Sequence, residues 1–137
     1  MSTVFLLDTN VVSYFLRRAS PVLEERASQA LRAQSCAISV LTRAELRFGQ
    51  CGMEPGDKRR ALIDAFLLRL PCLPWGQEAA DRYGALKDSL RRAGTPIGEL
   101  DTQIAAHALA ERLTLVTHNT RHFVQVPGLR LEDWMVG

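Results

Sequence analysis

Short apolar runs alternate with longer segments of helical periodicity along this chain, and this alternation constrains the fold more than any other feature. We predict strands over 4–7, 36–40, 113–117 and 129–131, with a short extended piece over 72–75. The run 4–7 is apolar at every position, which is typical of a strand buried on both faces. Strands separated by helical segments indicate βαβ units, and we therefore predict an α/β fold with a parallel sheet covered by helices.

The predicted helices begin at recognisable start signals. Ser20 followed by Pro21 is a cap residue with proline at the first helical position. Thr42 and Glu45 have the spacing of a capping box, in which the glutamate bonds back to the cap N–H. We predict helices over 11–16, 21–34, from 42, from 57, 79–90 and 100–112.

Length and composition limit the class of protein. The chain has 137 residues, 47% of them hydrophobic, and a net charge of +2, so we expect a single domain, 1–137, with one sizeable core. That small net charge neither indicates nor excludes a nucleic-acid partner. Three cysteines without a CxxC pair do not resemble a disulfide framework or a zinc site. The first apolar run is too short for a signal peptide or a membrane span, so we expect a reduced, cytoplasmic protein.

Four polar residues come directly after predicted strands or in the first turn of a helix: Asp8, Glu45, Asp101 and Asn119. Right-handed crossovers place the carboxyl ends of parallel strands at one edge of the sheet, where ligands bind. Crowded carboxylates repel one another, and a divalent cation relieves that repulsion. Hard oxygen donors of this kind suit Mg²⁺ or Mn²⁺.

Each of these residues also has a purely structural explanation. Asp8 is a candidate helix cap, Glu45 a member of the capping box, Asp101 a partner for the helix dipole and Asn119 a turn residue. The residues alone leave a site and four unrelated local roles equally open.

Taken together, the segments 5–10, 39–46, 96–108, 115–123, 126–129 and 132–134 resemble the PIN-domain ribonucleases, in particular the VapC-type toxins of bacterial toxin–antitoxin pairs. The matching segments cover nearly the whole chain in the family's order. The resemblance implies a three-layer α/β/α PIN-like fold with a central, mostly parallel sheet of four or five strands.

The same resemblance implies a site and a reaction. Asp8, Glu45 and Asp101 would be catalytic residues and ligands of Mg²⁺ or Mn²⁺, with Asn119 as a weaker ligand where the family often has aspartate. The reaction would be hydrolysis of an RNA phosphodiester, with water attacking and the 3′ oxygen leaving. The RNA would be tRNA, initiator tRNA among the candidates, and cleavage would inhibit translation and growth.

Partners follow from the resemblance too. It implies a VapB-type antitoxin, a homodimer and a higher toxin–antitoxin assembly, with Tyr14, Phe15 and the apolar face of helix 21–34 as a groove for the antitoxin; ordinary core packing explains the same residues. Candidate substrate contacts are Thr9, Asn10, Arg43, Arg47, Thr117, His118 and Arg121. Arginines cluster where phosphate is bound, although helix charges of this kind are more often only solvated. We expect a packed role for His107, whereas His122 flanks the site and is open to either a substrate contact or a surface role.

Two other functions remain open at this stage. A catalytically idle PIN-like module that binds RNA or protein is favoured by Asn119 and opposed by the intact Asp8, Glu45 and Asp101. A metal-dependent phosphatase would need a second aspartate two residues after Asp8, where the chain has Asn10.

Overall fold

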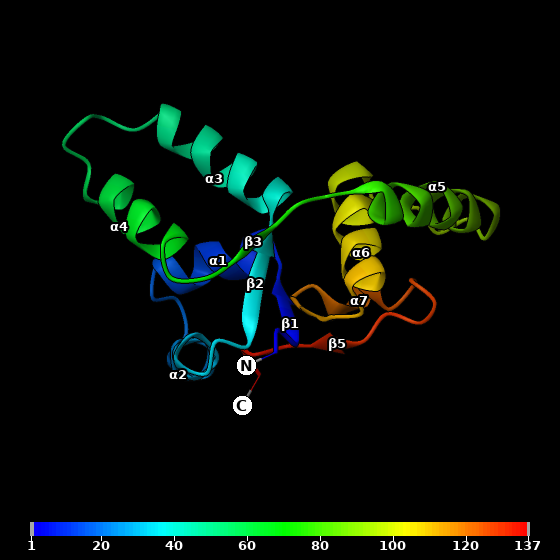
Figure 1. Ribbon diagram of the computed structural model, residues 1–137, viewed down its shortest axis with the longest axis horizontal. Coiled ribbons are helices and arrows are strands. Elements are labelled where there is room, and N and C mark those ends of the chain that lie inside the picture. Colours follow the sequence, from blue (N-terminus) through cyan, green and yellow to red (C-terminus); the bar gives the residue numbers. More distant parts are fainter. Residues whose placement is uncertain (1, 137) are drawn as a thin grey trace.

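The computed structural model describes residues 2–136, and within them a five-stranded sheet has the order β3-β2-β1-β4-β5 (Figure 1). The strands are β1 (Phe5–Leu7), β2 (Cys36–Ser39), β3 (Cys72–Leu73), β4 (Thr114–Val116) and β5 (Leu131–Glu132). Every neighbouring pair is parallel, with Leu6 opposite both Ala37 and Leu115. The predicted parallel sheet is thus confirmed, at the upper of the two expected strand numbers.

Helices cover both faces of this sheet, which gives the three-layer α/β/α arrangement that the resemblance implied (Figure 1). On one side lie α1 (Thr9–Leu16), α2 (Pro21–Arg32) and α4 (Lys58–Leu67), and on the other α5 (Gln77–Arg92) and α6 (Glu99–Glu111). The helix α3 (Val40–Cys51) extends from the end of β2 and packs on α4, and the short α7 (Thr120–Phe123) follows β4.

Alternation along the strands produces two apolar clusters, one on each face of the sheet. Leu7 and Val116 pack with residues of α1, α2 and α4, whereas Leu6 and Leu115 pack with residues of α5 and α6. Successive side chains of a strand point to opposite faces, so neighbouring leucines serve different clusters. The all-apolar runs noted in the sequence are therefore strands buried on both sides.

The helix after β2 begins earlier than the sequence pattern predicted. It starts at Val40, and the Ser39 hydroxyl caps it by accepting a hydrogen bond from the Leu41 amide at 3.1 Å. Thr42 is therefore inside the helix, fully buried, with its Oγ1 2.8 Å from Oγ1 of Thr9. The capping box of Thr42 and Glu45 is wrong, and with it the structural explanation for Glu45.

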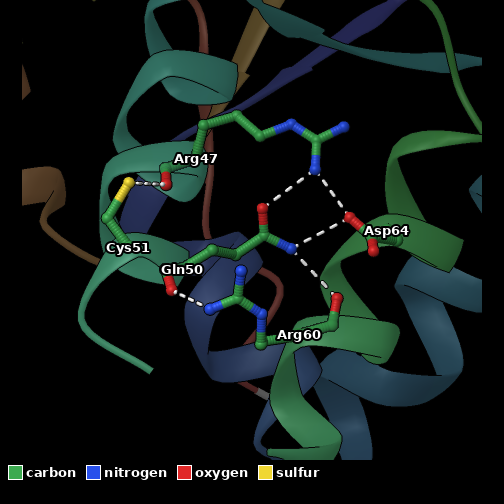
Figure 2. A network of polar contacts seen from close by, with 5 residues as sticks. All are labelled: Arg47, Gln50, Cys51, Arg60 and Asp64. Atoms are coloured by element: carbon green, nitrogen blue, oxygen red, sulfur yellow. Dashed lines mark hydrogen bonds and ion pairs between the residues drawn. The ribbon is translucent and has the colours of Figure 1, made fainter. Parts of the chain in front are cut away.

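A polar network joins α3 to α4 (Figure 2). The buried Gln50 amide donates to the Arg60 carbonyl and to Oδ1 of Asp64, both at 3.0 Å, and Arg47 donates to Oε1 of Gln50 at 2.9 Å. Arg60 in turn donates to the carbonyls of Gln50 and Met53. This network fixes the α3–α4 pair, since every polar atom of the Gln50 side chain is used.

A buried histidine connects α6 to the start of α3. Nδ1 of His107 lies 2.8 Å from Oγ of Ser39, and both side chains are almost fully buried. Burial lowers the pKa of His107 and outweighs the opposing effects of the Glu111 carboxylate and the Pro74 carbonyl. The packed role expected for this histidine is confirmed.

Among residues 2–136, no helix combines the length and apolar composition that crossing a membrane requires. The three cysteines are free; Cys36 is buried, Cys72 is half-buried and Cys51 is exposed.

The depressed pKa of His107 predicts a loss of stability in mild acid. The native state keeps the ring neutral, whereas the unfolded chain takes up a proton as the pH falls below about 6.5. The free energy of unfolding should therefore be fully present above about pH 6.5 and fall from there towards the lower native pKa. Urea unfolding between pH 8 and pH 5 should show a weaker decline for His107→Gln than for the parent chain.

Ser39→Ala is the comparison variant, because it removes the same hydrogen bond, together with the cap of α3, and keeps the histidine. It should lower stability by about 2 kcal/mol at every pH without reducing the decline. An unchanged pH dependence in His107→Gln would contradict the assignment.

Candidate functional site

The candidate site lies at the carboxyl ends of the two central strands, β1 and β4. The chain adds β2 and then β3 next to one edge of β1, and it later adds β4 and then β5 next to the opposite edge of β1. Ligands of open α/β sheets bind at such a reversal of strand order. Asp8 directly follows β1, and Thr117 directly follows β4.

Asp8 is held rigidly by two hydrogen bonds, one to each carboxylate oxygen. Oδ1 accepts from the Thr9 amide at 2.8 Å and so caps α1, and Oδ2 accepts from Oγ1 of Thr117 at 3.0 Å. The residue is 4% exposed, and burial raises its pKa. The charge of Asp101 raises this pKa further, while the bonds from Thr117 and Thr9 and the nearby His122 oppose the rise. Asp8 therefore does cap α1, as the structural explanation predicted, but it also lies close to a second acid, Asp101.

Asp101 reaches the same place from the first turn of α6. This helix starts at Gly98, whose φ of 95° is one that L side chains rarely adopt and whose carbonyl accepts from the amide and the hydroxyl of Thr102. Asp101 is half-buried, and burial raises the pKa of its carboxyl group, with the charge of His122 acting in the opposite sense.

His122 connects Asp101 to Asn119. Nδ1 of His122 lies 3.1 Å from Oδ2 of Asp101 and 2.9 Å from Nδ2 of Asn119. When Nδ1 carries the proton it donates to Asp101, and when it does not it accepts from Asn119. His122 therefore places a group that can be cationic directly beside an acid of the site.

Glu45 comes from α3. It is exposed there, one turn beyond the buried Thr42 that contacts Thr9. Within residues 2–136, no three His, Cys, Asp or Glu side chains converge closely enough to form a metal site by themselves. The structure therefore brings Asp8 and Asp101 near each other, with Asn119 linked through His122, and Glu45 does not complete a three-ligand cluster with the two aspartates.

These donors fit a hard divalent cation. Two carboxylates with raised pKa values face one region, and the charge of Asp101 disfavours ionisation of Asp8, a repulsion that a bound cation removes. Mg²⁺ usually binds one or two protein carboxylates and keeps several waters, so a complete set of protein ligands is not needed. Each oxygen of Asp8 accepts one hydrogen bond and retains a second lone pair.

The predicted substrate contacts divide into two groups. Thr9, Asn10, Thr117 and His118 lie directly after β1 and β4, beside the acids. Arg43 lies on α3 and is half-buried, while Arg121 is exposed on α7. Arg47 forms an ion pair with Asp64 at 2.6 Å within the α3–α4 network, so its guanidinium group contacts protein in this structure. Their roles towards RNA stay predictions.

The sequence placed His122 beside the site and left its role open between a substrate contact and a surface position, but it did not predict the contacts of His122 with Asp101 and Asn119. One signal pointed to them: His122 lies three residues after Asn119, and on a helix that spacing places two side chains on one face. The run is only four residues long, too short for periodicity to reveal a helix there.

Comparison with known proteins agrees with this geometry. The family model described as the PIN domain matches residues 5–129. The chain is 35% identical to the tRNA(fMet)-specific endonuclease VapC of Salmonella typhimurium (95% of this chain, 97% of the relative). It is 38% identical to ribonuclease VapC2 of Haemophilus influenzae (96% and 98%).

Solved structures give the same result. The complex VapBC2 from Rickettsia felis, bound to a DNA fragment from its promoter, has a chain that superposes with a TM-score of 0.88 at 31% identity (96% of this chain, 99% of that one). DNA-bound VapBC from Salmonella typhimurium also reaches 0.88, at 33% identity (96% and 98%). The chain therefore belongs to the PIN-domain family, and its curated relatives are VapC ribonucleases.

The raised pKa of Asp8 predicts a link between metal and stability. Its ionised form destabilises the native state, since the stability present at acid pH is lost as pH rises through the native pKa. Asp8→Asn should leave the melting temperature at pH 7 without metal equal or higher, because asparagine also caps helices. Mg²⁺ at ten times its dissociation constant should stabilise the parent chain by about 1.4 kcal/mol and the variant by less.

Calorimetry with Mg²⁺ and with EDTA checks this prediction. Asp88→Asn is a suitable control, because Asp88 is paired with Arg91 and Arg92 on α5, outside this site. Equal stabilisation of the parent chain and Asp8→Asn by Mg²⁺ would contradict a metal role for Asp8.

Proposed function

We propose that this protein is a Mg²⁺- or Mn²⁺-dependent endoribonuclease and the toxin of a toxin–antitoxin pair. The observation that carries the proposal is the pairing of two burial-shifted carboxylates, Asp8 and Asp101, at the strand-order reversal of a PIN-domain sheet. Relatives that align over nearly the whole chain are named as ribonucleases, which supports RNA as the substrate class.

In the proposed mechanism Asp8, Glu45 and Asp101 would hold the ion, with Asn119 as a weaker ligand; Asp8 is buried and Glu45 is exposed on α3. The ion would supply the charge that activates water and stabilises the phosphodiester in the transition state. Thr117 and the Thr9 amide fix the orientation of the Asp8 carboxylate. His122 holds Asp101 in place and can carry a proton at Nδ1.

Asn119 determines how many ions the site can hold. Its amide oxygen can ligate a cation but brings no charge, so we propose one firmly bound ion and a weak second position. This asparagine also contacts His122 at 2.9 Å, which keeps it at the edge of the acidic pair.

The relatives suggest the substrate and the partner. We propose that the chain cleaves tRNA, with initiator tRNA as the first candidate, because one relative is named a tRNA(fMet)-specific endonuclease. A VapB-type antitoxin and a homodimer within a larger assembly are proposed because the solved relatives are VapBC complexes. We further propose that residues 1–137 form one PIN domain acting in the cytoplasm, where its RNA substrate is found.

The second candidate is an idle PIN-like module that binds RNA or a protein. One observation favours it: within residues 2–136 Glu45 does not join Asp8 and Asp101 in a three-ligand cluster. Bound phosphate and water can complete the coordination of Mg²⁺, however, so we rank this function below the nuclease.

Purified protein incubated with tRNA and Mg²⁺ should produce discrete cleavage products, and EDTA should abolish them. Asp8→Asn and Asp101→Asn should each lower kcat at least 100-fold, because each removes a charge from the ion's ligands. Glu45→Gln should have a smaller effect, since Glu45 is exposed and forms no three-ligand cluster with Asp8 and Asp101 among residues 2–136. Primer extension across the cleaved bond is the measurement.

Asp81→Asn is the control, since Asp81 is an exposed aspartate on α5 outside the site. Melting temperatures that are no lower than that of the parent chain would show that the losses of activity are chemical. Cleavage by Asp8→Asn at the parental rate would disprove the assignment of the acids, and EDTA-resistant cleavage would disprove the metal requirement.

A further inference from the structure

A small cavity lies beside the acidic pair and is not explained by metal binding. Its volume is about 290 Å³, and its lining is Asn10, Tyr14, His118 and Asn119. Pockets for drug-sized ligands begin at about 300 Å³, so this one suits a group the size of a single heterocyclic ring system. Two aromatic rings and two amides form it, and no carboxylate lines it.

The two rings form walls that meet at a right angle. The centroids of Tyr14 and His118 are 6.1 Å apart, and the ring planes are inclined by 90°. A flat group parallel to one of these rings stacks on it and meets the other ring nearly edge-on, which are the two favoured contacts between aromatic systems. Arg17 lies over one face of the Tyr14 ring, with its Cζ 5.3 Å from the ring centre, and adds positive charge beside the cavity.

The orientation of the His118 ring is fixed by a contact with a carboxylate. Its Nδ1 lies 3.0 Å from Oδ2 of Asp133, whose side chain is only 15% exposed. The other oxygen of Asp133 accepts a hydrogen bond from the Met135 amide at 2.9 Å. The ring plane is therefore set by a buried, fixed carboxylate and is ready for a ligand without reorganisation.

Residues that line the cavity are connected to the acids, both along the chain and through hydrogen bonds. Asn10 lies two residues after Asp8. Asn119 contacts His122, which in turn contacts Asp101. A nucleotide whose phosphate lies at Asp8 and Asp101 would thus have a ring-lined cavity next to it, with amides from both sides able to bond to the edge of a base.

We propose that this cavity is a nucleobase subsite, which takes an unpaired base of the nucleotide that flanks the scissile phosphodiester. The proposal rests on the proposed nuclease function and deepens it, because it names the part of the substrate that this surface binds. Tyr14 and His118 supply the stacking surface. Asn10 supplies a donor and an acceptor, and Asn119, whose oxygen is assigned to the ion, supplies the N–H that His122 leaves free.

A base is favoured over a peptide side chain for physical reasons. Unpaired bases in RNA are bound by stacking on aromatic side chains and by hydrogen bonds to their edges, and this cavity offers both. The positive charge of Arg17 suits the RNA backbone. A basic side chain from a protein partner would find no carboxylate among the lining residues.

Cleavage of substrates that lack one base tests the proposal. Single-stranded oligonucleotides spanning the cleaved bond would carry one abasic nucleotide, moved stepwise along the chain. Removal of the base that fills the cavity should raise KM about tenfold with little change in kcat, as expected for the loss of one stacked base. Tyr14→Leu should raise KM by a similar factor on the intact substrate and remove the further penalty of that abasic position.

Tyr83→Leu is the matched control. Tyr83 also has an aromatic neighbour, Trp75 at 5.9 Å, and a cation, Lys87 at 5.5 Å, but it lies on α5 away from the cavity. It should keep the parental abasic profile. Because Tyr14 also packs against the core, the more exposed His118→Leu is a second variant that should reproduce the effect.

The outcomes separate the two hypotheses. If the parent chain cleaves but the Tyr14 and abasic effects simply multiply, the subsite is wrong and the nuclease function stands. If both variants lose only the affinity for the antitoxin and keep the parental profile, the cavity holds a peptide and the subsite is again wrong. If the parent chain cleaves no RNA in the presence of Mg²⁺, the proposed function fails and the subsite fails with it.

Discussion

The two hydrogen bonds of Asp8 are the interaction on which the rest of the site depends. One oxygen caps α1 and the other accepts from Thr117, so a single carboxylate joins the end of β1 to the end of β4. Ionising a buried acid is costly unless it is compensated, and here two hydrogen bonds and the nearby His122 supply only part of the compensation. The remaining imbalance makes the site receptive to a cation, because local structure has placed Asp8 where Asp101 also reaches.

Two further side-chain contacts connect the helices that surround Asp8. The hydroxyls of Thr9 and Thr42 meet at 2.8 Å and bring α3, with Glu45 on it, to the edge that bears Asp8. His107 bonds to Ser39 at the start of the same helix and comes from α6, whose first turn holds Asp101. The helices α3 and α6, which bear Glu45 and Asp101, are therefore connected through buried polar groups. Buried polar groups are nearly always hydrogen-bonded, because leaving one without a partner is costly. These contacts hold Asp8 and Asp101 in fixed positions, and the proposed base-binding cavity beside them adds selectivity.

The strand and helix order was predictable because it follows from hydrophobic period and from local signals such as Ser20 before Pro21. The start of α3 was not, since Val40 and Leu41 continue the apolar run of β2 and look like strand, while Ser39 at its end acts as the cap. The helix α7 was missed because four residues are too few to show a period. At the site, the resemblance to the family named Asp8, Glu45 and Asp101, but neither it nor the spacing revealed that His122 would pair with Asp101 or that Glu45 would be exposed.

The sequence by itself determined the alternation of strands and helices, the parallel sheet that it requires, and the identity of the acids at the carboxyl edge of that sheet. These follow from periodicity and from chain crossovers that have one hand. Only the tertiary structure decided which of those acids meet, what holds them and what lies beside them. Thr117 reaches Asp8, His122 reaches Asp101, and His118 stands against Tyr14. Such pairings depend on how far separate segments are rotated and shifted when both faces of the sheet are packed, and no local pattern encodes that.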